Sequence, residues 1–445
     1  MASIRDKTLS FPNVDPVTGV RFSPIAHLFK MELQRAKGTR DFLPEEKIKR
    51  QYVVDTLRKV FENYGFVPLE TPILERYETL SAKFAAGEES DALKETFKLK
   101  DQGGRQLGLR FDLTVPLSRV IAMNPQLKMP FKRYQIGMAF RDGPIEKGRI
   151  REFWQCDTDI IGVKSMKADA EILNLVKDAF NALKLKVKIK VNNRKLLNSI
   201  LDYLDIKNKD SVIITLDKLS KIGVQSVKKE LKDKKLKDEI INELIKLISI
   251  KGSNKEKFEK LEFLKDKEGL EELKELNKYF KNFEFDVSLA RGLSYYTGTV
   301  FEVVLDDKSL GCSIAGGGRY DKMIGGFIGK GEYPAVGIAF GLEPISNAIK
   351  FKEIKSLSKL FVIPIGAYKE SLKIVQELRD NGINAEIDLM DRGISKNLDY
   401  ADKLGIPYVL FIGEDEIKKK KFKLKDMKTG REEFLDLKEL VKLLK

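Results

Sequence analysis

The chain has 445 residues, of which 42% are hydrophobic and 33% charged. This is about three times the length of a typical domain of roughly 150 residues, so we expect several domains and at least one large core. No stretch approaches the roughly 18 unbroken apolar residues of a membrane-spanning helix, so we expect no contact with a membrane. With 82 Lys and Arg against 67 Asp and Glu, the formal net charge is +15. This excess favours a polyanionic partner, although lysine-rich surfaces also occur on thermostable proteins without one.

Histidine and cysteine are scarce, and this argues against several kinds of active site. The only histidine is His27, in a segment of about residues 1–30 that we expect to be a leader or extension detached from the main fold. Ser-His-Asp triads, Cys-His dyads and His-rich zinc sites are therefore hard to build. Cys156 and Cys312 are too few for a four-thiolate zinc site or a disulfide framework. We expect no zinc and a reducing, cytoplasmic location.

The first elements predicted along the chain are a helix and several antiparallel strands. Apolar residues at helical spacing predict a helix over 44–64. Short apolar runs predict strands at 107–116, 131–140 and 150–161. About nine residues join the last two, too few for a crossover helix, so they should form a hairpin. A second hairpin is expected over 296–319 with its turn at 306–308, and the sheet should be mainly antiparallel, unlike a Rossmann sheet.

The rest of the chain predicts a helical module and a second domain. A helix near 169–183 and a strand at 185–191 precede a lysine-rich stretch from about 196 to 280, where Leu and Ile recur at helical spacing. We interpret this stretch as an inserted helical module, whose lysines are either a solvated face or a surface for RNA. From 358 to the end, strands and helices alternate, which predicts a small α/β domain with a parallel sheet.

The segment 151–159 carries the first candidate site. As a strand, it has a period of two that places several chemically useful side chains on one face. A cation, an aromatic ring, an amide and two acids suit a ligand that combines a flat base, a phosphate and an ammonium group. The alternative is an ion-paired face in solvent. The residues on this face are Arg151, Phe153, Gln155, Asp157 and Asp159.

Three other segments repeat this mixture of donors and acceptors. They are a predicted strand over 109–114, the end of the first hairpin strand, and the segment 290–298 with its glycines. Each alone is ambiguous, because charged strand ends are often solvated and tyrosines often only pack. A glycine-rich strand end at 315–321 would admit a ligand close to the backbone. The side chains concerned are Arg110, Asp112, Thr114, Arg141, Arg291, Tyr295 and Tyr296.

The sequence lacks the usual phosphate-binding loops. Gly325 to Lys330 falls one residue short of the P-loop spacing, and Gly331 follows where Ser or Thr is needed. No G-x-G-x-x-G segment follows a strand in a βαβ context. Any ATP must therefore bind on the antiparallel sheet.

Taken in order, these segments resemble class II aminoacyl-tRNA synthetases and, within them, the histidyl-tRNA synthetase family. The resemblance runs from about residue 35 to the end and is weakest in the inserted module. The peptides RGLSYY at 291–296 and GGRYD at 317–321 resemble the two that set the histidine enzymes apart. The segments similar to the family's opening and to its motifs 1, 2 and 3 are 37–44, 69–72, 140–153 and 337–343. Residues 412–416 resemble part of the family's anticodon-binding domain.

The resemblance implies an α+β fold with a class II antiparallel sheet flanked by helices. It implies a catalytic domain over 31–350, which contains the module, and an anticodon-binding domain over 358–445. The implied activity is that of a histidine–tRNA ligase, which activates L-histidine with ATP to histidyl-adenylate and transfers it to the 3′ end of tRNA(His). Mg²⁺ is expected with the pyrophosphate of ATP, and a homodimer through the motif 1 helices. The alternative is a non-catalytic regulatory subunit like that of ATP phosphoribosyltransferase.

The resemblance also assigns roles to residues. The histidine site would consist of Asp112, Leu113, Thr114, Arg141, Gln155, Asp159, Arg291, Tyr295, Tyr296 and Tyr320. The ATP site would consist of Arg141, Arg149, Phe153 and Arg291. By the same resemblance Arg141 and Arg291 would be the catalytic pair, which agrees with the chemistry, since fixed cations stabilise a pentacoordinate phosphate and no general base is required. No side chain is assigned to a metal.

Three positions depart from the family pattern. Pro344 follows Glu343 where motif 3 commonly has an arginine aimed at the γ-phosphate, so ATP use is less secure than histidine binding. One hypothesis is that Arg149, Arg151 or Lys147 supplies the missing cation. Gly143 stands where the motif 2 loop often has an acid, so backbone or Glu146 would contact adenine. Ser294 also replaces a frequent acid.

Overall fold

The computed structural model describes two units, residues 33–40 and a larger unit that begins at Asp41. In the first, the Thr39 hydroxyl donates a hydrogen bond to the Ala36 carbonyl (2.8 Å). The leader expected over 1–30 lies outside the described residues. None of the described helices is long and apolar enough to span a bilayer. The described ranges are 33–82, 91–145, 150–291, 295–307 and 310–445.

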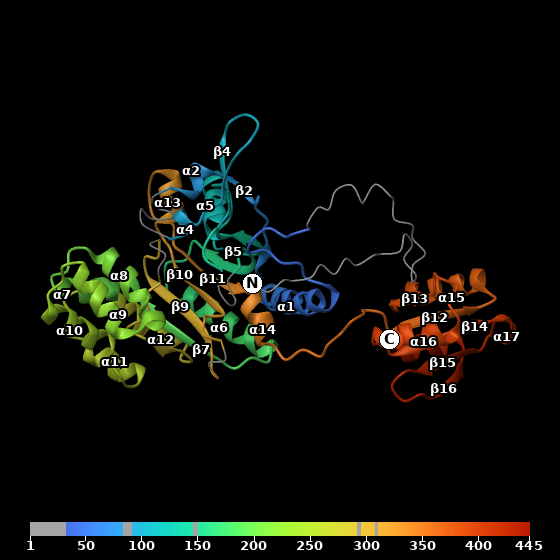
Figure 1. Ribbon diagram of the computed structural model, residues 1–445. Helices are drawn as coiled ribbons and strands as arrows, with labels where there is room; N and C mark the ends of the chain where they lie inside the picture. Colours follow the sequence, from blue (N-terminus) through green and yellow to red (C-terminus); the bar gives the residue numbers. More distant parts are fainter. Residues whose placement is uncertain (1–32, 83–90, 146–149, 292–294, 308–309) are drawn as a thin grey trace, which may run out of the picture. The chain divides into compact units, whose positions relative to one another are not determined.

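The second unit contains a large eight-stranded sheet (Figure 1). Strand β5 pairs antiparallel with β6 over ten residues, and β9 pairs antiparallel with β10. Within this sheet as described, only the edge pairs β1–β5 and β7–β8 are parallel. The strand pairing of both predicted hairpins and the mainly antiparallel sheet are therefore confirmed, while Lys308 of the second predicted turn lies outside the described residues. In spatial order the strands are β1 (Val67–Pro68), β5 (Phe131–Phe140), β6 (Glu152–Ile161), β11 (Ala335–Gly341), β10 (Ala315–Arg319), β9 (Thr299–Leu305), β7 (Val187–Asn193) and β8 (Glu284–Phe285).

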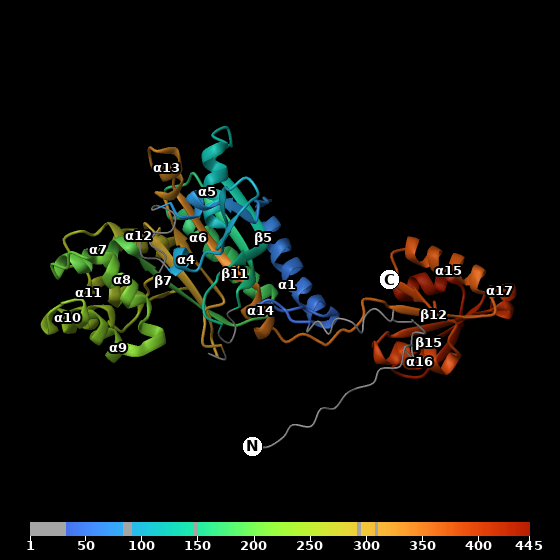
Figure 2. The ribbon, with the colours of Figure 1, turned by 45° about the horizontal axis from the view of Figure 1, so that its top comes forward.

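Three helices cover one face of this sheet (Figure 2): α1 (Pro44–Asn63), α6 (Lys167–Ala182) and α14 (Leu342–Ala348). Helix α1 begins with a proline and two glutamates, which suit the first turn, and ends just before Gly65 at φ 75°. The Phe340 ring of β11 lies 5.5 Å from the rings of both Phe61 and Phe180. The helices and the sheet thus share one apolar core, which leaves the other face of the sheet free for polar groups.

The strand predicted at 107–116 belongs to a smaller, three-stranded sheet, which several short helices accompany. That strand ends at Leu109, and α5 begins at Thr114, so the prediction is wrong over its second half. The Asp112 carboxylate accepts a hydrogen bond from the Val115 N–H (3.0 Å), and Pro116 suits the first turn of a helix. The elements are β2 (Leu74–Arg76), β4 (Gln106–Leu109), β3 (Lys98–Lys100), α2 (Tyr77–Leu80), α4 (Asp91–Lys94), α5 (Thr114–Met123) and α13 (Met323–Ile328).

The lysine-rich stretch forms six helices between β7 and β8, as predicted. Helix α7 begins where the Asn193 side chain accepts a hydrogen bond from the Lys195 N–H (2.9 Å). Leu244 and Leu273 are fully buried and belong to the same core as the large sheet. The helices are α7 (Arg194–Tyr203), α8 (Lys209–Asp217), α9 (Leu219–Asp233), α10 (Asp238–Ile248), α11 (Asn254–Lys260) and α12 (Glu268–Tyr279).

The last part of the chain has a five-stranded sheet with its own core around Val362, Leu378 and Leu410. Strand β12 pairs in parallel with β13 and β14, as the sequence predicts. Two further strands, β15 and β16, extend this sheet antiparallel. The elements are β12 (Leu360–Ile365), α15 (Tyr368–Asp380), β13 (Ala385–Ile387), α16 (Ile394–Lys403), β14 (Tyr408–Gly413), α17 (Glu414–Lys419), β15 (Phe422–Asp426), β16 (Glu432–Leu435) and α18 (Leu437–Leu444).

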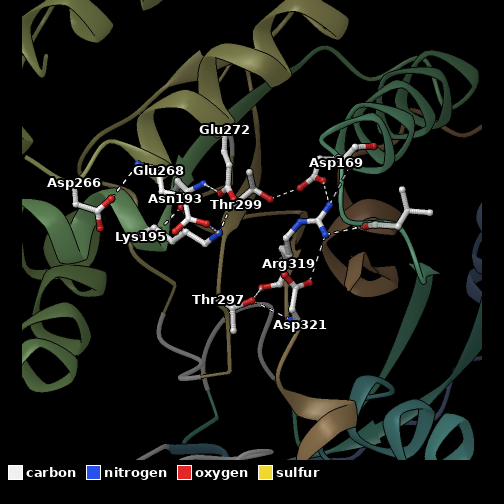
Figure 3. Close-up of polar contacts among 12 residues, drawn as sticks. Asp169, Asn193, Lys195, Asp266, Glu268, Glu272, Thr297, Thr299, Arg319 and Asp321 are labelled. Atoms are coloured by element: carbon white, nitrogen blue, oxygen red, sulfur yellow. Dashed lines mark hydrogen bonds and ion pairs between the residues drawn. The ribbon is translucent and has the colours of Figure 1, made fainter. Parts of the chain in front are cut away.

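A buried polar network ties β10 to α6 and β9 (Figure 3). Arg319 and Asp169 form an ion pair and are 1% and 0% exposed. The Thr299 hydroxyl donates a hydrogen bond to the same carboxylate, and Arg319 Nη1 donates to the Val163 carbonyl (3.0 Å). Because burial removes these charges from water, the pair must stay intact for either charge to be tolerated.

We therefore predict that Asp169→Asn destabilises the protein by about 3–5 kcal/mol, since it leaves the Arg319 charge buried without an anion. A lower urea midpoint of unfolding would measure this loss. The matched control is Asp238→Asn, which breaks an exposed ion pair with Lys232 (2.8 Å) and should leave the midpoint unchanged. Equal midpoints for the two variants would contradict the prediction.

Candidate active site on the antiparallel sheet

One cavity collects most of the predicted site residues. Nine of the twelve residues that we assigned to histidine or ATP line it, although they come from five separate stretches of sequence. They are Asp112, Thr114, Arg141, Gln155, Asp159, Arg291, Tyr295, Tyr296 and Tyr320. Asp157 and the glycines of β10 and β11 complete the lining.

Strand β6 carries two of the three acids in the cavity, and a glycine of β11 leaves room for one of them. Gln155, Asp157 and Asp159 alternate along β6 and point to the cavity, as the period of two predicts. Asp159 is paired in register with Gly337 of β11. A Cβ atom at Gly337 would overlap Asp159 Oδ1, so glycine is required for the carboxylate to lie where it does.

The Asp159 carboxylate is fixed from two sides. The Tyr320 hydroxyl donates a hydrogen bond to Oδ1 (2.6 Å), and Arg133 Nη2 lies 2.7 Å from Oδ2. Burial raises the pKa of Asp159, while Arg133 and the Tyr320 hydroxyl lower it. Burial, together with the Asp159 charge, raises the pKa of Tyr320 well above its ordinary value, so this phenol stays a donor.

Two more buried carboxyl groups share the cavity. Burial raises the pKa of Asp112 to about 6, against the opposing hydrogen bond from the Val115 N–H and the charge of Arg141. Burial, with the charges of Asp159 and Asp112, raises the pKa of Asp157 well above its usual range despite Arg133. Asp112 Oδ2 and Asp157 Oδ1 have no hydrogen-bond partner among the described residues. Gln155 Oε1 also has no hydrogen-bond partner there. All three oxygens can accept hydrogen bonds from a cationic ligand.

Three tyrosines and Arg291 form a further part of the cavity wall. The rings of Tyr295 and Tyr296 lie 4.7 Å apart, and the Tyr320 ring lies 6.2 Å from Tyr295. The guanidinium of Arg291 occupies the space that a side chain at Gly316 would fill. This wall can pack against a flat ring and present one cation to an anion.

Arg141 directly follows β5, and its side chain lies beside the ring of Phe153. Its Nε donates a hydrogen bond to the Phe111 carbonyl (3.1 Å), and its Cζ lies 5.1 Å from the centre of the Phe153 ring. Phe153 is half-buried and does not line the cavity. Leu113 does not line it either, and its side chain is fully buried.

The loop after Arg141 is described only in part. Arg149, Lys147 and Glu146 lie outside the described residues, as does Ser294. Arg151 pairs with Asp142 (2.9 Å).

The space beside Gly143 is occupied by a side chain from another segment of the chain, that of Glu95. A Cβ atom there would come within 2.5 Å of Glu95 Oε1, and the Asp142 N–H donates a hydrogen bond to the Glu95 carbonyl (2.7 Å). The carboxylate of Glu95 thus lies where an acid at 143 would project. It was absent from the sequence-based assignment because it is remote in the chain.

Arg110 is not part of the cavity, which corrects its predicted place beside Asp112. Its guanidinium donates hydrogen bonds to the carbonyls of Thr71 (2.6 Å) and Met138 (2.7 Å). Strand β4 ends at Leu109, before both Arg110 and Asp112, so strand alternation does not place the two side chains on one face.

The sequence-based assignment also missed Arg133. It stands directly opposite Asp159 in the β5–β6 register, and it is fully buried. A lone arginine inside a strand was the available signal, but its partner is known only once the register is known.

Motif 3 ends in a buried ion pair. Arg50 of α1 lies 2.8 Å from Glu343, and the Trp154 N–H donates a hydrogen bond to the same carboxylate (3.2 Å).

Within the described residues, no group of three or more His, Cys, Asp or Glu is placed to hold a metal ion.

The comparisons with known proteins agree along the chain. A family model described as histidyl-tRNA synthetase matches residues 38–345, and one described as an anticodon binding domain matches 359–445. Histidine–tRNA ligase 1 of Bacillus cereus is 44% identical over 418 residues, which cover 90% of this chain and 97% of the relative. The crystal structure of histidyl-tRNA synthetase from Nostoc sp. PCC 7120 has a TM-score of 0.81 and 33% identity, and covers 93% of this chain and 99% of that one.

The antiparallel sheet, with motif 2 on β5 and β6 and motif 3 on β11 and α14, is that of a class II aminoacyl-tRNA synthetase. Within that class, the chain belongs to the histidyl-tRNA synthetase family and is an aminoacyl-tRNA ligase. A structure titled as an ATP phosphoribosyltransferase regulatory subunit/histidyl-tRNA synthetase, from Bacillus halodurans C, is 23% identical with a TM-score of 0.72 and shares the fold.

Proposed function

We propose that the chain activates L-histidine with ATP to histidyl-adenylate and then transfers histidine to the 3′ end of tRNA(His), releasing AMP and diphosphate. The observation that carries this proposal is the single cavity in which Asp112, Asp159, Arg141 and Arg291 meet. Three acids suit an amino acid that carries an ammonium and a basic ring, and two arginines suit its carboxylate beside a phosphate.

The amino acid binds at the acidic end of the cavity. Asp112, Thr114 and Gln155 hold the α-ammonium, and the unpartnered oxygens of Asp112 and Gln155 support this role. Asp159 accepts a hydrogen bond from the imidazole N–H, with the phenols of Tyr295, Tyr296 and Tyr320 around the ring. Leu113 does not line the cavity and acts by holding Asp112 and Thr114 on either side of it.

ATP binds at the basic end. Adenine stacks on Phe153, and Arg141 bridges the histidine carboxylate and the α-phosphate, while Arg291 reaches that phosphate from the other side. The carboxylate attacks the α-phosphorus in line, an O–P bond forms, and pyrophosphate leaves with its electron pair. Both guanidiniums stabilise the charge of the pentacoordinate phosphate. Mg²⁺ enters with ATP as part of the substrate, and Arg149 contacts the outer phosphates.

Pro344 favours a second candidate, a regulatory subunit without catalysis, because motif 3 then lacks a cation for the γ-phosphate. The full set of acids and arginines in the cavity favours the enzyme. So does the match of residues 359–445 to an anticodon binding domain. We propose a catalytic domain over 31–350 and an anticodon-binding domain over 358–445.

The first test is ATP–pyrophosphate exchange with each of the twenty amino acids, followed by charging of tRNA. We expect exchange with histidine and charging of tRNA(His). Exchange with no amino acid would favour the regulatory subunit. Exchange with a different amino acid would reject the assignment of the ring-binding residues.

Gly337→Ala tests the position of Asp159. The added methyl overlaps Asp159 Oδ1, so we expect the histidine KM to rise by about 10-fold or more, the equivalent of one lost charged hydrogen bond. The control is Gly311→Ala, since a Cβ there meets nothing within 4 Å. A histidine KM equal for both variants would contradict the prediction.

A homodimer is also proposed, through the region of motif 1. Three apolar residues next to it, Val67, Ile73 and Leu74, are 48%, 39% and 50% exposed in the isolated chain, and a second copy would cover them. Sedimentation equilibrium should give twice the chain mass of 50.7 kDa, and a monomer would reject the proposal.

Cys156 and Cys312 are free thiols, which supports a cytoplasmic location.

A further inference from the structure

We propose that Arg133 is a positioning residue that fixes the ammonium-binding and ring-binding ends of the histidine site relative to each other. This inference rests on the proposed function, because it assigns the two ends by their roles there. Arg133 does not line the cavity and would not touch the substrate. It acts through the groups that do.

One nitrogen of Arg133 joins the two ends. Nη2 lies 2.7 Å from Asp159 Oδ2 and donates a hydrogen bond to the Leu113 carbonyl (3.2 Å). Leu113 stands between Asp112 and Thr114, in the short segment that precedes α5. The strand that carries the ring-binding acid is thereby connected to the segment that carries the ammonium-binding groups.

The orientation of Asp159 depends on this contact. Tyr320 anchors one carboxylate oxygen and Arg133 the other, so rotation of the carboxylate would break at least one charged contact. The guanidinium is 0% exposed, and water cannot replace it there. An acid held at both oxygens presents its remaining lone pairs in a fixed direction, as selection of one ring N–H requires.

Arg133 also balances the charge of the whole acidic cluster. Its charge lowers the pKa of Asp112, Asp157 and Asp159 at once, against the burial that raises all three. The other cations of the cavity, Arg141 and Arg291, are needed for anionic groups of the substrates. Without Arg133, the three acids would share less positive charge and would hold protons at higher pH.

The test compares Arg133→Met, Arg133→Lys and a control in pyrophosphate exchange. Methionine removes the charge and both contacts, whereas lysine keeps the charge but lacks the planar fork. The control is Arg194→Met, which removes another buried arginine, paired with Asp210 (2.7 Å) in the helical module. Circular dichroism and thermal unfolding report whether each variant is folded.

For Arg133→Met we expect a histidine KM about 100-fold or more above wild type, since loss of the arginine leaves the charge of Asp159 buried without its partner. The ATP KM should stay within about 3-fold, because the nucleotide end is not touched. Arg133→Lys should restore part of the loss, and Arg194→Met should retain both wild-type constants. A wild-type histidine KM in Arg133→Met, or an equal rise of both KM values, would overturn the proposal.

The pH profile separates positioning from a purely structural effect. The titratable and charged groups around Asp159 are Arg133 from β5, Tyr320 directly after β10, Asp157 on the same face of β6, and Asp112 in the same cavity. Loss of the cation raises the pKa of the acids. The histidine KM should therefore begin to rise at a higher pH on acidification in Arg133→Met than in wild type. Coincident profiles would overturn the proposal.

If Arg133→Met does not fold, Arg133→Lys, Tyr320→Phe and their double variant decide the question. Both changes act on the Asp159 carboxylate, so their effects on the histidine KM should not add. Additive effects would overturn the proposal. Failure of the proposed function has a different signature, since the wild-type protein would then show no exchange with histidine.

Discussion

The structure depends on how an antiparallel sheet tolerates three carboxyl groups buried in one cavity. Burial alone would keep Asp112, Asp157 and Asp159 protonated, and each carries a raised pKa. Arg133, buried behind them, and the hydroxyl of Tyr320 lower the cost of ionising Asp159. The unpartnered oxygens that remain are an incomplete set of contacts, which a cationic ligand completes.

The two faces of the same sheet have different roles, one in stability and the other in substrate binding. Helices α1, α6 and α14 cover one face with an apolar core, while the acids and arginines gather on the other. Behind the site, the buried pair of Arg319 and Asp169 ties β10 to α6 next to Tyr320. The residues proposed to bind substrate are thus held by groups that the substrate never meets.

Much of the fold could be predicted from sequence, because it depends on local patterns. The short link between 140 and 152 required a hairpin, and the alternation in β6 placed Gln155, Asp157 and Asp159 together. The β4 prediction failed after Leu109, since strand alternation was extended into residues that cap and begin α5. A capping carboxylate and an early proline were the local signals against it.

The site could be predicted only in part. Periodicity and the family resemblance named most of the residues lining the cavity, but Arg133 and Glu95 are defined by contacts between remote segments. Arg133 meets Asp159 through strand register, and Glu95 fills the space beside Gly143 from a different loop. Such pairs follow from tertiary structure, and no pattern within either segment contains them.

The ten-residue pairing of β5 with β6 also limits how this protein can vary. Side chains alternate across a strand, so a single inserted residue within β6 would turn Gln155, Asp157 and Asp159 into the apolar core and bring Trp154 and Cys156 to the substrate side. Insertions and deletions within either strand should therefore abolish activity. The link between the two strands is constrained for another reason, since it carries Arg149, the residue proposed to contact the outer phosphates of ATP.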